Sequence, residues 1–355
     1  MRVAIDTNGR HTTKAGTARY LRGLLGGLKA EADPAEWEFL ELAWPVDNFG
    51  FEQPQRALKT AYREVVWARW VAPRQLRRAR PSVYHSTASP LLDPPSDIAH
   101  VVTLHDLAVL RFPERFRPWH RLTTLRGLRR LGSAARIICI SQATADEALQ
   151  RLAVRADRLT VVYNGCDFHD LPPSFGRPPS PLPPGEFFLF VGSLEPGKNL
   201  TLLRETYRLA AAEGQRLPPL CIAGARWSGV PGEGRPPADW HYLGHVTDEQ
   251  LVWLYRHARA LLFPSKYEGF GLPVAEAMAL GCPVVCSPVA SLPEVGGEAA
   301  WFTALDPAAY LATARELLRD DAARVDRIDK GRRQAARFHW RRCARETLAA
   351  YTAAI

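Results

Sequence analysis

Short apolar runs rich in β-branched and aromatic residues alternate with longer amphipathic stretches along the chain. In the first half, these runs predict strands at Arg2–Asp6, Glu38–Ala43, Ser82–His85, Ile98–Leu104, Arg136–Ile140 and Leu159–Tyr163. In the second half, they predict strands at Phe187–Val191, Leu220–Ala223, Ala260–Phe263 and Pro283–Cys286. Strands that alternate with helices form parallel sheets covered on both faces. The pattern therefore predicts an α/β protein with two doubly wound, Rossmann-like domains.

A proline-rich segment interrupts this rhythm at Leu171–Glu186, where seven of sixteen residues are proline. Neither a helix nor a central strand persists there, because proline lacks the backbone N–H donor. We interpret the segment as a stiff linker between an N-terminal domain at residues 1–170 and a C-terminal domain at residues 187–335. The alternative is a long surface loop within one domain. Residues 336–355 have the apolar spacing of a terminal helix, which we expect to pack back toward the N-terminal domain.

Composition narrows the class of protein. Apolar residues make up 46% of the 355 residues and charged residues 23%, which excludes a disordered, collagenous or coiled-coil chain. No apolar run approaches the ~20 residues that cross a bilayer. The N-terminal strand turns polar at Asp6, unlike a secretory signal, so we expect a cytoplasmic protein. No C-x-x-C pair occurs, and we expect buried packing thiols at Cys139, Cys166, Cys221, Cys282, Cys286 and Cys343.

The stretch Pro264–Ala279 is the most informative part of the sequence. It follows a predicted strand, turns through Gly269 and Gly271, and opens a helix whose first turn accommodates Pro273. Backbone N–H groups at such a helix start suit an anion or polyol oxygens. Glu268 precedes the turn and Glu276 lies inside the helix, so both carboxylates can flank one pocket. A glutamate in a first turn usually only compensates the helix dipole, but Glu268 in an apolar turn needs a hydrogen-bonding partner.

A second stretch, Phe187–Leu200, also reads as strand, glycine-containing loop and helix. Lys198 ends the loop, where α/β domains bind phosphates, although most lysines are simply surface residues. The loop is not a Walker motif, because Asn199 stands where Ser or Thr is required. Gly192 and Gly197 also lack the spacing of a dinucleotide fingerprint.

These segments together resemble the retaining glycosyltransferases of GT-B fold known as family four or group 1. The resemblance rests on E-G-F-G-L-P-V-A-E at 268–276, V-G-S-L-E-P-G-K-N at 191–199, L-G-H-V-T-D-E-Q-L at 243–251 and G-C-P-V-V-C-S at 281–287. It continues in the N-terminal half through G-T-A-R-Y at 16–20, T-L-H-D-L at 103–107, I-C-I-S-Q-A-T at 138–144 and V-V-Y-N-G-C-D at 161–167. It implies two domains facing across a cleft and a hexosyltransferase that uses a nucleotide diphosphate sugar.

The resemblance also implies roles for the C-terminal domain. Glu268 would meet hydroxyls of the donor sugar, and Glu276 would accept hydrogen bonds from the ribose. Lys198, beside Ser193, would neutralise the diphosphate as the glycosidic bond breaks. The loop that includes Val246 is similar to the one that takes the base. Backbone groups facing the sugar and diphosphate would come from Gly269, Phe270, Gly271 and Leu272.

From the N-terminal domain, the resemblance implies two further site residues. Gly16 would let the first loop approach the phosphates closely, as glycine permits. His105 matches the family's active-site histidine near the donor sugar. The alternative for His105 is a strand-end residue satisfied by the neighbouring carboxylate of Asp106.

The chain departs from many relatives at the diphosphate loop. Ser193 and Gly197 stand where relatives often carry arginine, and we consider Arg226 a replacement. No D-x-D sequence occurs, and that pair is what metal-dependent sugar-nucleotide enzymes use to hold a divalent cation. We therefore expect no metal and no other cofactor. No side chain is an obvious nucleophile of the glycosidase type, and the L-E-P-x-K-N pattern favours GDP-mannose weakly.

Two basic, aromatic stretches in the N-terminal half suggest a membrane partner. Arg56–Arg80 holds eight basic residues against Glu64 alone, and Arg111–Arg130 holds seven against Glu114. Such runs are either solvated helix faces or a monotopic contact with anionic lipid, which would suit a lipid-linked acceptor and a peripheral location at the inner membrane face. A glycan is the other acceptor class that we expect.

Two rival functions remain from the sequence. A sugar-nucleotide epimerase or hydrolase could use the same scaffold. The net charge of +9 motivates a nucleic-acid binder, but the chain carries no recognised binding motif, so we expect no nucleic-acid partner.

Overall fold

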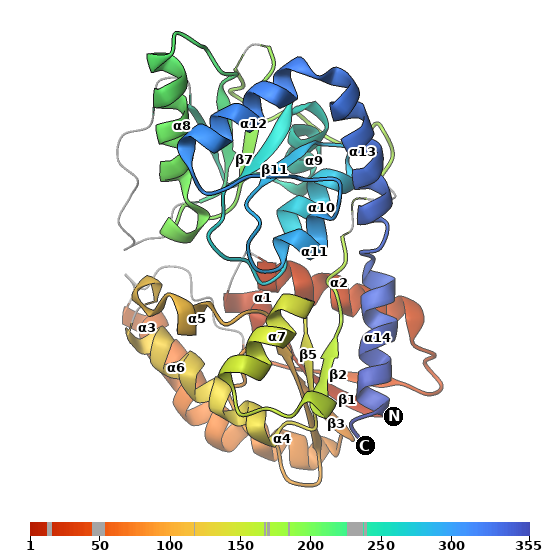
Figure 1. Ribbon diagram of the computed structural model, residues 1–355. Coiled ribbons are helices and arrows are strands. Elements are labelled where there is room, and N and C mark those ends of the chain that lie inside the picture. The colour runs from red at the N-terminus through yellow and green to blue at the C-terminus, as the bar shows by residue number, and fades with distance from the viewer. Residues whose placement is uncertain are drawn as a thin grey trace. The chain divides into compact units, whose positions relative to one another are not determined.

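The computed structural model describes residues 1–12, 16–44, 54–116, 118–166, 168, 171–183, 185–225, 237 and 240–355. The chain forms two compact units (Figure 1). Unit 1 comprises Met1–Gly165 with His339–Ile355, and unit 2 comprises Cys166–Phe338. The proline-rich segment thus groups with unit 2 and the terminal helix with unit 1.

Unit 1 contains a parallel sheet with the order β2-β1-β3-β4-β5-β6. Its strands are β1 (Arg2–Asp6), β2 (Glu38–Leu42), β3 (Val83–Ser86), β4 (Ala99–Leu104), β5 (Arg136–Cys139) and β6 (Leu159–Val161). All six lie within the predicted runs or within a residue of them. The strand order reverses between β1 and β3, and open α/β sheets bind ligands beyond the carboxyl ends of the strands at such a point.

The described helices of unit 1 surround this sheet. They are α1 (Gly9–Thr12), α2 (Gly16–Glu31), α3 (Pro54–Ala61), α4 (Ala72–Ala79), α5 (Ala108–Arg111), α6 (Pro118–Arg129), α7 (Gln142–Arg151) and α14 (Trp340–Thr352). A ten-residue π-helix, η1 (Tyr62–Val71), joins α3 to α4, and short 3₁₀ turns lie at η2 (Pro113–Arg115), η3 (Arg130–Ser133) and η4 (Ala156–Arg158).

Helices α2 and α14 share one face of this sheet and lie side by side (Figure 1). They pack close together because Gly23 and Gly27 of α2 leave room for Trp340 of α14. A Cβ on Gly23 would lie 2.1 Å from the Trp340 ring, and a Cβ on Gly27 would lie 2.5 Å from the Trp340 carbonyl oxygen. The opposite face is packed against η1 and α4 at one end and against α6 and α7 at the other.

Unit 2 contains a second parallel sheet with the order β12-β11-β10-β7-β8-β9. Its strands are β7 (Phe188–Val191), β8 (Leu220–Ala223), β9 (Trp240–Gly244), β10 (Ala260–Phe263), β11 (Val284–Cys286) and β12 (Trp301–Phe302). Numbered within the unit, this is the Rossmann order 3-2-1-4-5-6, with the reversal between β7 and β10. The hydrophobic pattern did not predict β9, which is only partly buried, or β12, which has only two residues.

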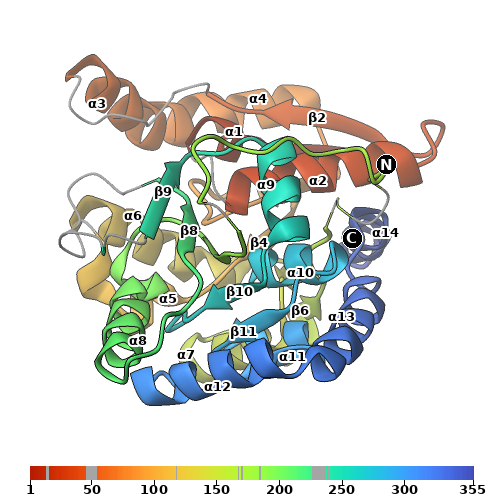
Figure 2. The same cartoon turned by 90° about the horizontal axis from the view of Figure 1, so that it is seen from above.

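The described helices of unit 2 cover both faces of its sheet. They are α8 (Leu200–Ala212), α9 (Asp248–His257), α10 (Leu272–Ala279), α11 (Leu292–Gly296), α12 (Pro307–Arg319) and α13 (Asp321–Ala335), with a 3₁₀ turn at η5 (Pro196–Lys198). Phe188 and Phe190 of β7 face α8 and α12 in one apolar core. Figure 2 shows α8 and α12 along one side of this sheet and α9 along the other.

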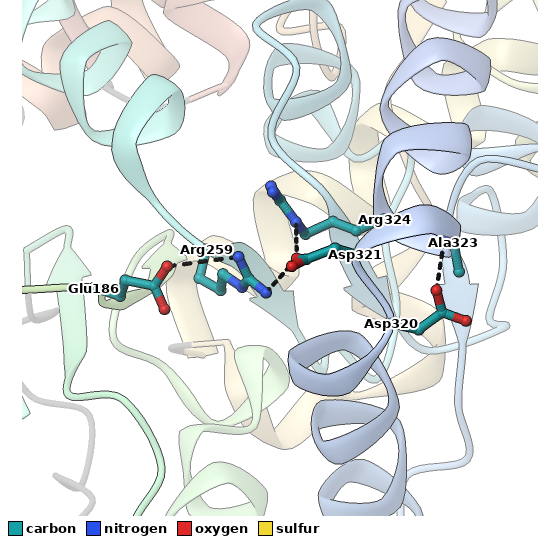
Figure 3. Close-up of polar contacts among 6 residues, drawn as sticks. All are labelled: Glu186, Arg259, Asp320, Asp321, Ala323 and Arg324. Atoms are coloured by element: carbon teal, nitrogen blue, oxygen red, sulfur yellow. Dashed lines mark hydrogen bonds and ion pairs between the residues drawn. The ribbon is translucent and has the colours of Figure 1, made fainter.

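Two arginines of unit 2 form ion pairs and hydrogen bonds with segments at its periphery. Arg259, directly before β10, forms ion pairs with Glu186 and with Asp321 at the start of α13, and Asp320 caps that helix at the Ala323 N–H (Figure 3). Arg256 of α9 donates hydrogen bonds to the carbonyls of Leu171, Pro173 and Phe175. The first part of the proline-rich segment is therefore bound to α9.

All six cysteines are buried and unpaired, which confirms the prediction of packing thiols. Burial raises the pKa of Cys282 to about 12, so this thiol stays protonated and unreactive at neutral pH.

Candidate active site

Most of the unit 2 residues predicted to bind the donor lie beyond the carboxyl ends of β7 and β10, where the strand order of unit 2 reverses. The loop after β7 contains Gly192, Ser193 and Lys198, and the loop after β10 contains Glu268 and Gly271. A backbone hydrogen bond from Lys266 N–H to the Gly197 carbonyl, 2.8 Å long, ties the two loops together. The fold thus brings two sequence segments about seventy residues apart into one site.

Local geometry positions Lys198 at the end of its loop. The Glu195 carboxylate accepts a hydrogen bond from the Gly197 N–H at 2.8 Å, which holds the 3₁₀ turn η5. Asn199 then adopts a left-handed conformation, φ 59°, directly before α8. Asparagine tolerates this conformation better than most side chains. The Lys198 side chain is consequently directed back toward the loop after β10.

Lys198 and Glu268 form an ion pair, with 2.5 Å between Lys198 Nζ and Glu268 Oε1. Their side chains are only 19% and 12% exposed. The Lys198 ammonium also lies 5.4 Å from the centre of the Phe263 ring. Glu268 therefore has the hydrogen-bonding partner that its apolar turn was expected to require.

Ser291 holds the turn that carries Glu268. Its buried hydroxyl lies 2.9 Å from both the Glu268 and the Phe270 carbonyl oxygens, which share its single proton as acceptors. Gly271 lies directly before α10 with φ 96°, and a Cβ there would come within 2.6 Å of Leu292. Only glycine fits this position without strain. As predicted, Pro273 occupies the first turn of α10.

Glu276 lies inside α10 and is 3% exposed. The Tyr255 hydroxyl of α9 donates a hydrogen bond to Glu276 Oε2 at 3.1 Å. The two glutamates therefore have different anchors: Lys198 holds Glu268, whereas Tyr255 holds Glu276.

Glycines bring neighbouring loops of unit 2 into close backbone contact. A Cβ on Gly224, after β8, would lie 1.8 Å from the Gly192 oxygen. The Gly192 N–H donates to the Ala223 carbonyl, and the Gly224 N–H donates to the carbonyl of Gly244, the last residue of β9. Val246 follows β9 and is half-buried, directly before the capping box that starts α9. Arg226 lies outside the described residues.

Unit 1 carries the two remaining predicted residues. Gly16 is exposed and begins α2. His105 directly follows β4 and donates a hydrogen bond from Nε2 to the Thr87 carbonyl at 2.8 Å. This bond leaves the lone pair on Nδ1. Burial lowers the pKa of His105, against opposing effects of the Thr87 carbonyl and the Asp106 carboxylate, so the imidazole is neutral at pH 7.

Hydrogen bonds connect His105 to the ends of β1 and β3, the two strands between which the order of the unit 1 sheet reverses. Thr87 follows β3, and its hydroxyl donates to the Asp6 carbonyl at the end of β1 at 2.7 Å. The ends of β1, β3 and β4 are thereby linked through Asp6, Thr87 and His105.

Sequence reasoning missed Ser291 and Tyr255. Tyr255 lies four residues after Leu251 on the buried face of α9, which signals burial but not the hydroxyl's partner. Ser291 carries no local signal, because its role depends on the loop after β10. Among the described residues, no group of three or more His, Cys, Asp or Glu side chains could hold a metal ion, and no helix has the length and apolarity of a membrane span.

Comparison with known proteins identifies the family. Residues 177–334 match the model of glycosyl transferases group 1, and residues 26–170 match that of glycosyltransferase family 4. The chain is 35% identical over 270 residues to the O-antigen chain mannosyltransferase B of Escherichia coli, covering 71% of this chain and 69% of that protein. It is 30% identical over 272 residues to the E. coli serotype-specific mannosyltransferase WbdA, of whose length it spans about one third (33%).

Solved structures show the same fold. Sucrose-phosphate synthase from Thermosynechococcus elongatus aligns over 99% of this chain and 98% of its own, with a TM-score of 0.73 at 20% identity. The Anabaena protein Alr3699/HepE, solved with UDP and glucose, aligns over 99% of both chains with a TM-score of 0.70 at 16% identity. The chain therefore belongs to the group 1 glycosyltransferases of GT-B fold, and it is a hexosyltransferase of the mannosyltransferase-like type.

Proposed function

We propose that the protein transfers a hexose, with mannose favoured, from a nucleotide diphosphate sugar to a glycan or lipid-linked acceptor, with retention at the anomeric carbon. The observation that carries this proposal is the Lys198–Glu268 ion pair at the reversal point of the unit 2 sheet. Mannosyltransferases among the relatives support the sugar, and a structural neighbour solved with UDP-glucose supports the donor class. The product would serve cell-surface polysaccharide or glycoconjugate synthesis.

The ion pair suggests how the donor is held. A diphosphate gives Lys198 a second anionic partner, and Glu268 can then accept hydrogen bonds from hydroxyls of the sugar. Lys198, Ser193 and the N–H groups at the start of α10 stabilise negative charge on the leaving diphosphate. Glu276 would accept hydrogen bonds from the ribose, and the loop at Val246 would take the base.

His105 supplies a neutral acceptor. Its Nε2–H is engaged by the Thr87 carbonyl, so Nδ1 is the atom that can accept a hydrogen bond from the donor sugar. Gly16 would allow close approach of the first loop to the phosphates. The sugar would then react as an oxocarbenium-like species on the face that the diphosphate leaves. We propose that no metal is required, because Lys198 and the helix start supply the positive charge.

A donor panel tests the proposal. Thermal unfolding is measured with GDP-mannose, UDP-glucose and the free nucleoside diphosphates, since a ligand at a hundred times its Kd adds roughly 2.7 kcal/mol of stability. The stabilising donor is then incubated with a mannose-terminated glycan in excess EDTA, and the new linkage is read by NMR. We expect an α-linked mannoside.

Three results would contradict parts of this proposal. A β-linked product would exclude retention, and activity that is lost in EDTA and restored by magnesium or manganese would exclude metal independence. Conversion of the donor without acceptor, to an epimer or a free sugar, would favour the rival epimerase or hydrolase.

We also propose that unit 1 contacts anionic lipid. The side chains of α4 and the end of η1 are arginine-rich and exposed, and they include Trp70, which is 46% exposed beneath the Arg69 guanidinium. Helix α6 adds the exposed Trp119 and Leu122. Arg117 and the side chain of Arg56 lie outside the described residues. Aromatic and basic side chains together suit a headgroup layer.

A further inference from the structure

A chain of hydrogen bonds runs through the core of unit 1, on the face covered by α2 and α14. The Tyr20 hydroxyl lies 2.8 Å from Thr103 Oγ1, and Thr103 Oγ1 lies 2.8 Å from His85 Nε2. His85 Nδ1 in turn lies 2.7 Å from the hydroxyl of Tyr351 in α14. The chain therefore links α2, β4, β3 and the C-terminal helix.

The sheet register makes this chain possible. His85 lies opposite Val101 in the pairing of β3 with β4, so Thr103, two residues later, projects from the same face. None of the four residues is more than 1% exposed, and their neighbours are apolar, including Val3, Ile5 and Ile138. Burial lowers the pKa of His85 to about 3, so its ring is neutral.

Polar groups buried in an apolar core cost stability relative to apolar residues of similar shape, unless each is hydrogen-bonded. Fully bonded buried networks fix one arrangement of their side chains. A neutral His85 has one N–H and one lone pair. It can therefore accept a hydrogen bond from one neighbouring hydroxyl and donate one to the other, so that every bond of the chain has its donor on the same side. The network thus holds the Tyr20 hydroxyl in a defined place.

The Tyr20 ring, which this network positions, contacts the His105 ring. The two rings meet edge to face, with centroids 4.8 Å apart and an interplanar angle of 86°. Trp340 of α14 contacts the Tyr20 ring from another side, at 6.0 Å. His105 is therefore fixed by two supports: the Thr87 carbonyl at Nε2 and the Tyr20 ring beside the imidazole.

We propose that Tyr20, Thr103, His85 and Tyr351 are positioning residues for His105, so that the C-terminal helix sets the direction of the His105 Nδ1 lone pair. This inference rests on the proposed role of His105 toward the donor sugar. The alternative role of these four residues is a contribution to folding alone, which predicts no specific effect on His105.

The first test removes single hydroxyls. Tyr351→Phe deletes the last hydroxyl of the chain, and Thr103→Val deletes its centre with little change of shape. We expect kcat to fall by about fivefold or more, as for loss of one hydrogen bond of ~1 kcal/mol, with the Kd for the nucleoside diphosphate unchanged. Thr103→Ser keeps the hydroxyl and should restore kcat.

The control is Thr347→Val. Thr347 lies one turn before Tyr351 on α14 and is fully buried, and its hydroxyl donates to the Cys343 carbonyl of its own helix at 2.7 Å. Thermal unfolding checks that all variants fold. If Thr347→Val lowers kcat as much as Tyr351→Phe, the effect is general loosening of α14 and the proposal is wrong.

A double-mutant comparison with His105 tests the positioning role separately from the proposed role of His105 toward the donor sugar. In a His105→Ala background, Tyr351→Phe should cause no further loss of kcat, because both act through the same ring. Independently of activity, the ¹⁵N resonances of the His105 ring should shift in Tyr351→Phe and stay in place in Thr347→Val. Unchanged His105 resonances overturn the positioning role. Shifted resonances together with a His105→Ala enzyme of full activity uphold it and overturn the catalytic role of His105.

Discussion

The two glutamates of the E-x7-E motif have different hydrogen-bonding partners, so we expect their substitution to affect different steps of donor binding and turnover. Glu268 shares its charge with Lys198 in a partly exposed pair. Glu276 is buried in α10, where the Tyr255 hydroxyl engages one of its oxygens. Removal of the Glu268 carboxylate takes away the ion-pair partner of the Lys198 ammonium, whereas removal of the Glu276 carboxylate takes away one hydrogen-bond acceptor of the Tyr255 hydroxyl.

We predict that Glu276→Ala weakens binding of the free nucleoside diphosphate by about tenfold or more, since hydrogen bonds to charged groups contribute ~1.5–3 kcal/mol. Glu268→Ala should leave this affinity intact, because Lys198 loses a competing partner, and should mainly lower turnover of the whole donor. Calorimetry with GDP and UDP measures the first effect and steady-state kinetics the second.

Glu298→Ala serves as the matched control, because Glu298 is an exposed carboxylate of unit 2. It should change neither quantity. Equal loss of nucleotide affinity in Glu268→Ala and Glu276→Ala would show that ribose and sugar have been assigned wrongly.

At the scale of elements, the contact between α2 and α14 depends on the absence of side chains. Gly23 and Gly27 are four residues apart, so both face α14, and a Cβ at either position would meet Trp340. The last helix of the chain is held to unit 1 at these points, and the same helix carries Tyr351.

We predict that Gly23→Ala lowers the free energy of unfolding by ~1–3 kcal/mol, the usual cost of overpacking. Gly26→Ala is the control on the same helix, since a Cβ there meets nothing within 4 Å. It should raise the free energy of unfolding by up to ~1 kcal/mol, because alanine favours the helix. Urea unfolding at equilibrium measures both. Equal stability of the two variants would mean that α14 does not pack against Gly23 in solution.

At the scale of the whole molecule, the two sheets differ in what they carry. The reversal point of unit 2 holds charged donor-binding candidates, whereas unit 1 carries His105 and an arginine-rich surface. A lipid-linked acceptor would be located at the membrane. The arginine-rich surface of unit 1 has the charge to bind anionic lipid at the same place.

We predict that the protein sediments with vesicles of anionic lipid and not with neutral vesicles, and that salt weakens the binding because charges are screened over ~8 Å at physiological strength. Replacing Arg74, Arg77, Arg78 and Arg80 with Ser should remove most of the binding and leave turnover of the donor intact. The control replaces four exposed arginines of unit 2, Arg208, Arg216, Arg319 and Arg333.

If the two quadruple variants lose binding equally, the attraction depends only on net charge. If the unaltered protein stays in the supernatant with anionic vesicles at low salt, the basic stretches are solvated helix faces. The acceptor would then be a water-soluble glycan.

The sequence by itself determined the features that depend on neighbouring residues. Within the described residues, apolar runs marked ten of the twelve strands, most of which are buried parallel strands and therefore apolar along their length. The glycines and Pro273 marked the turn into α10, because few residues allow that backbone. Together with the family motifs, these local signals placed Lys198, Glu268 and Glu276 in the candidate site.

Only the tertiary structure decided which of these residues touch. The Lys198–Glu268 pair joins residues seventy positions apart, and the His85–Tyr351 bond joins residues 266 positions apart. Such contacts follow from the order of strands in the sheet and from which helix covers which face, and neither leaves a local pattern. The apolar runs did not mark the strands β9 and β12. Strand β9 is only partly buried and includes His241, and β12 has only two residues, so neither forms a clear apolar run.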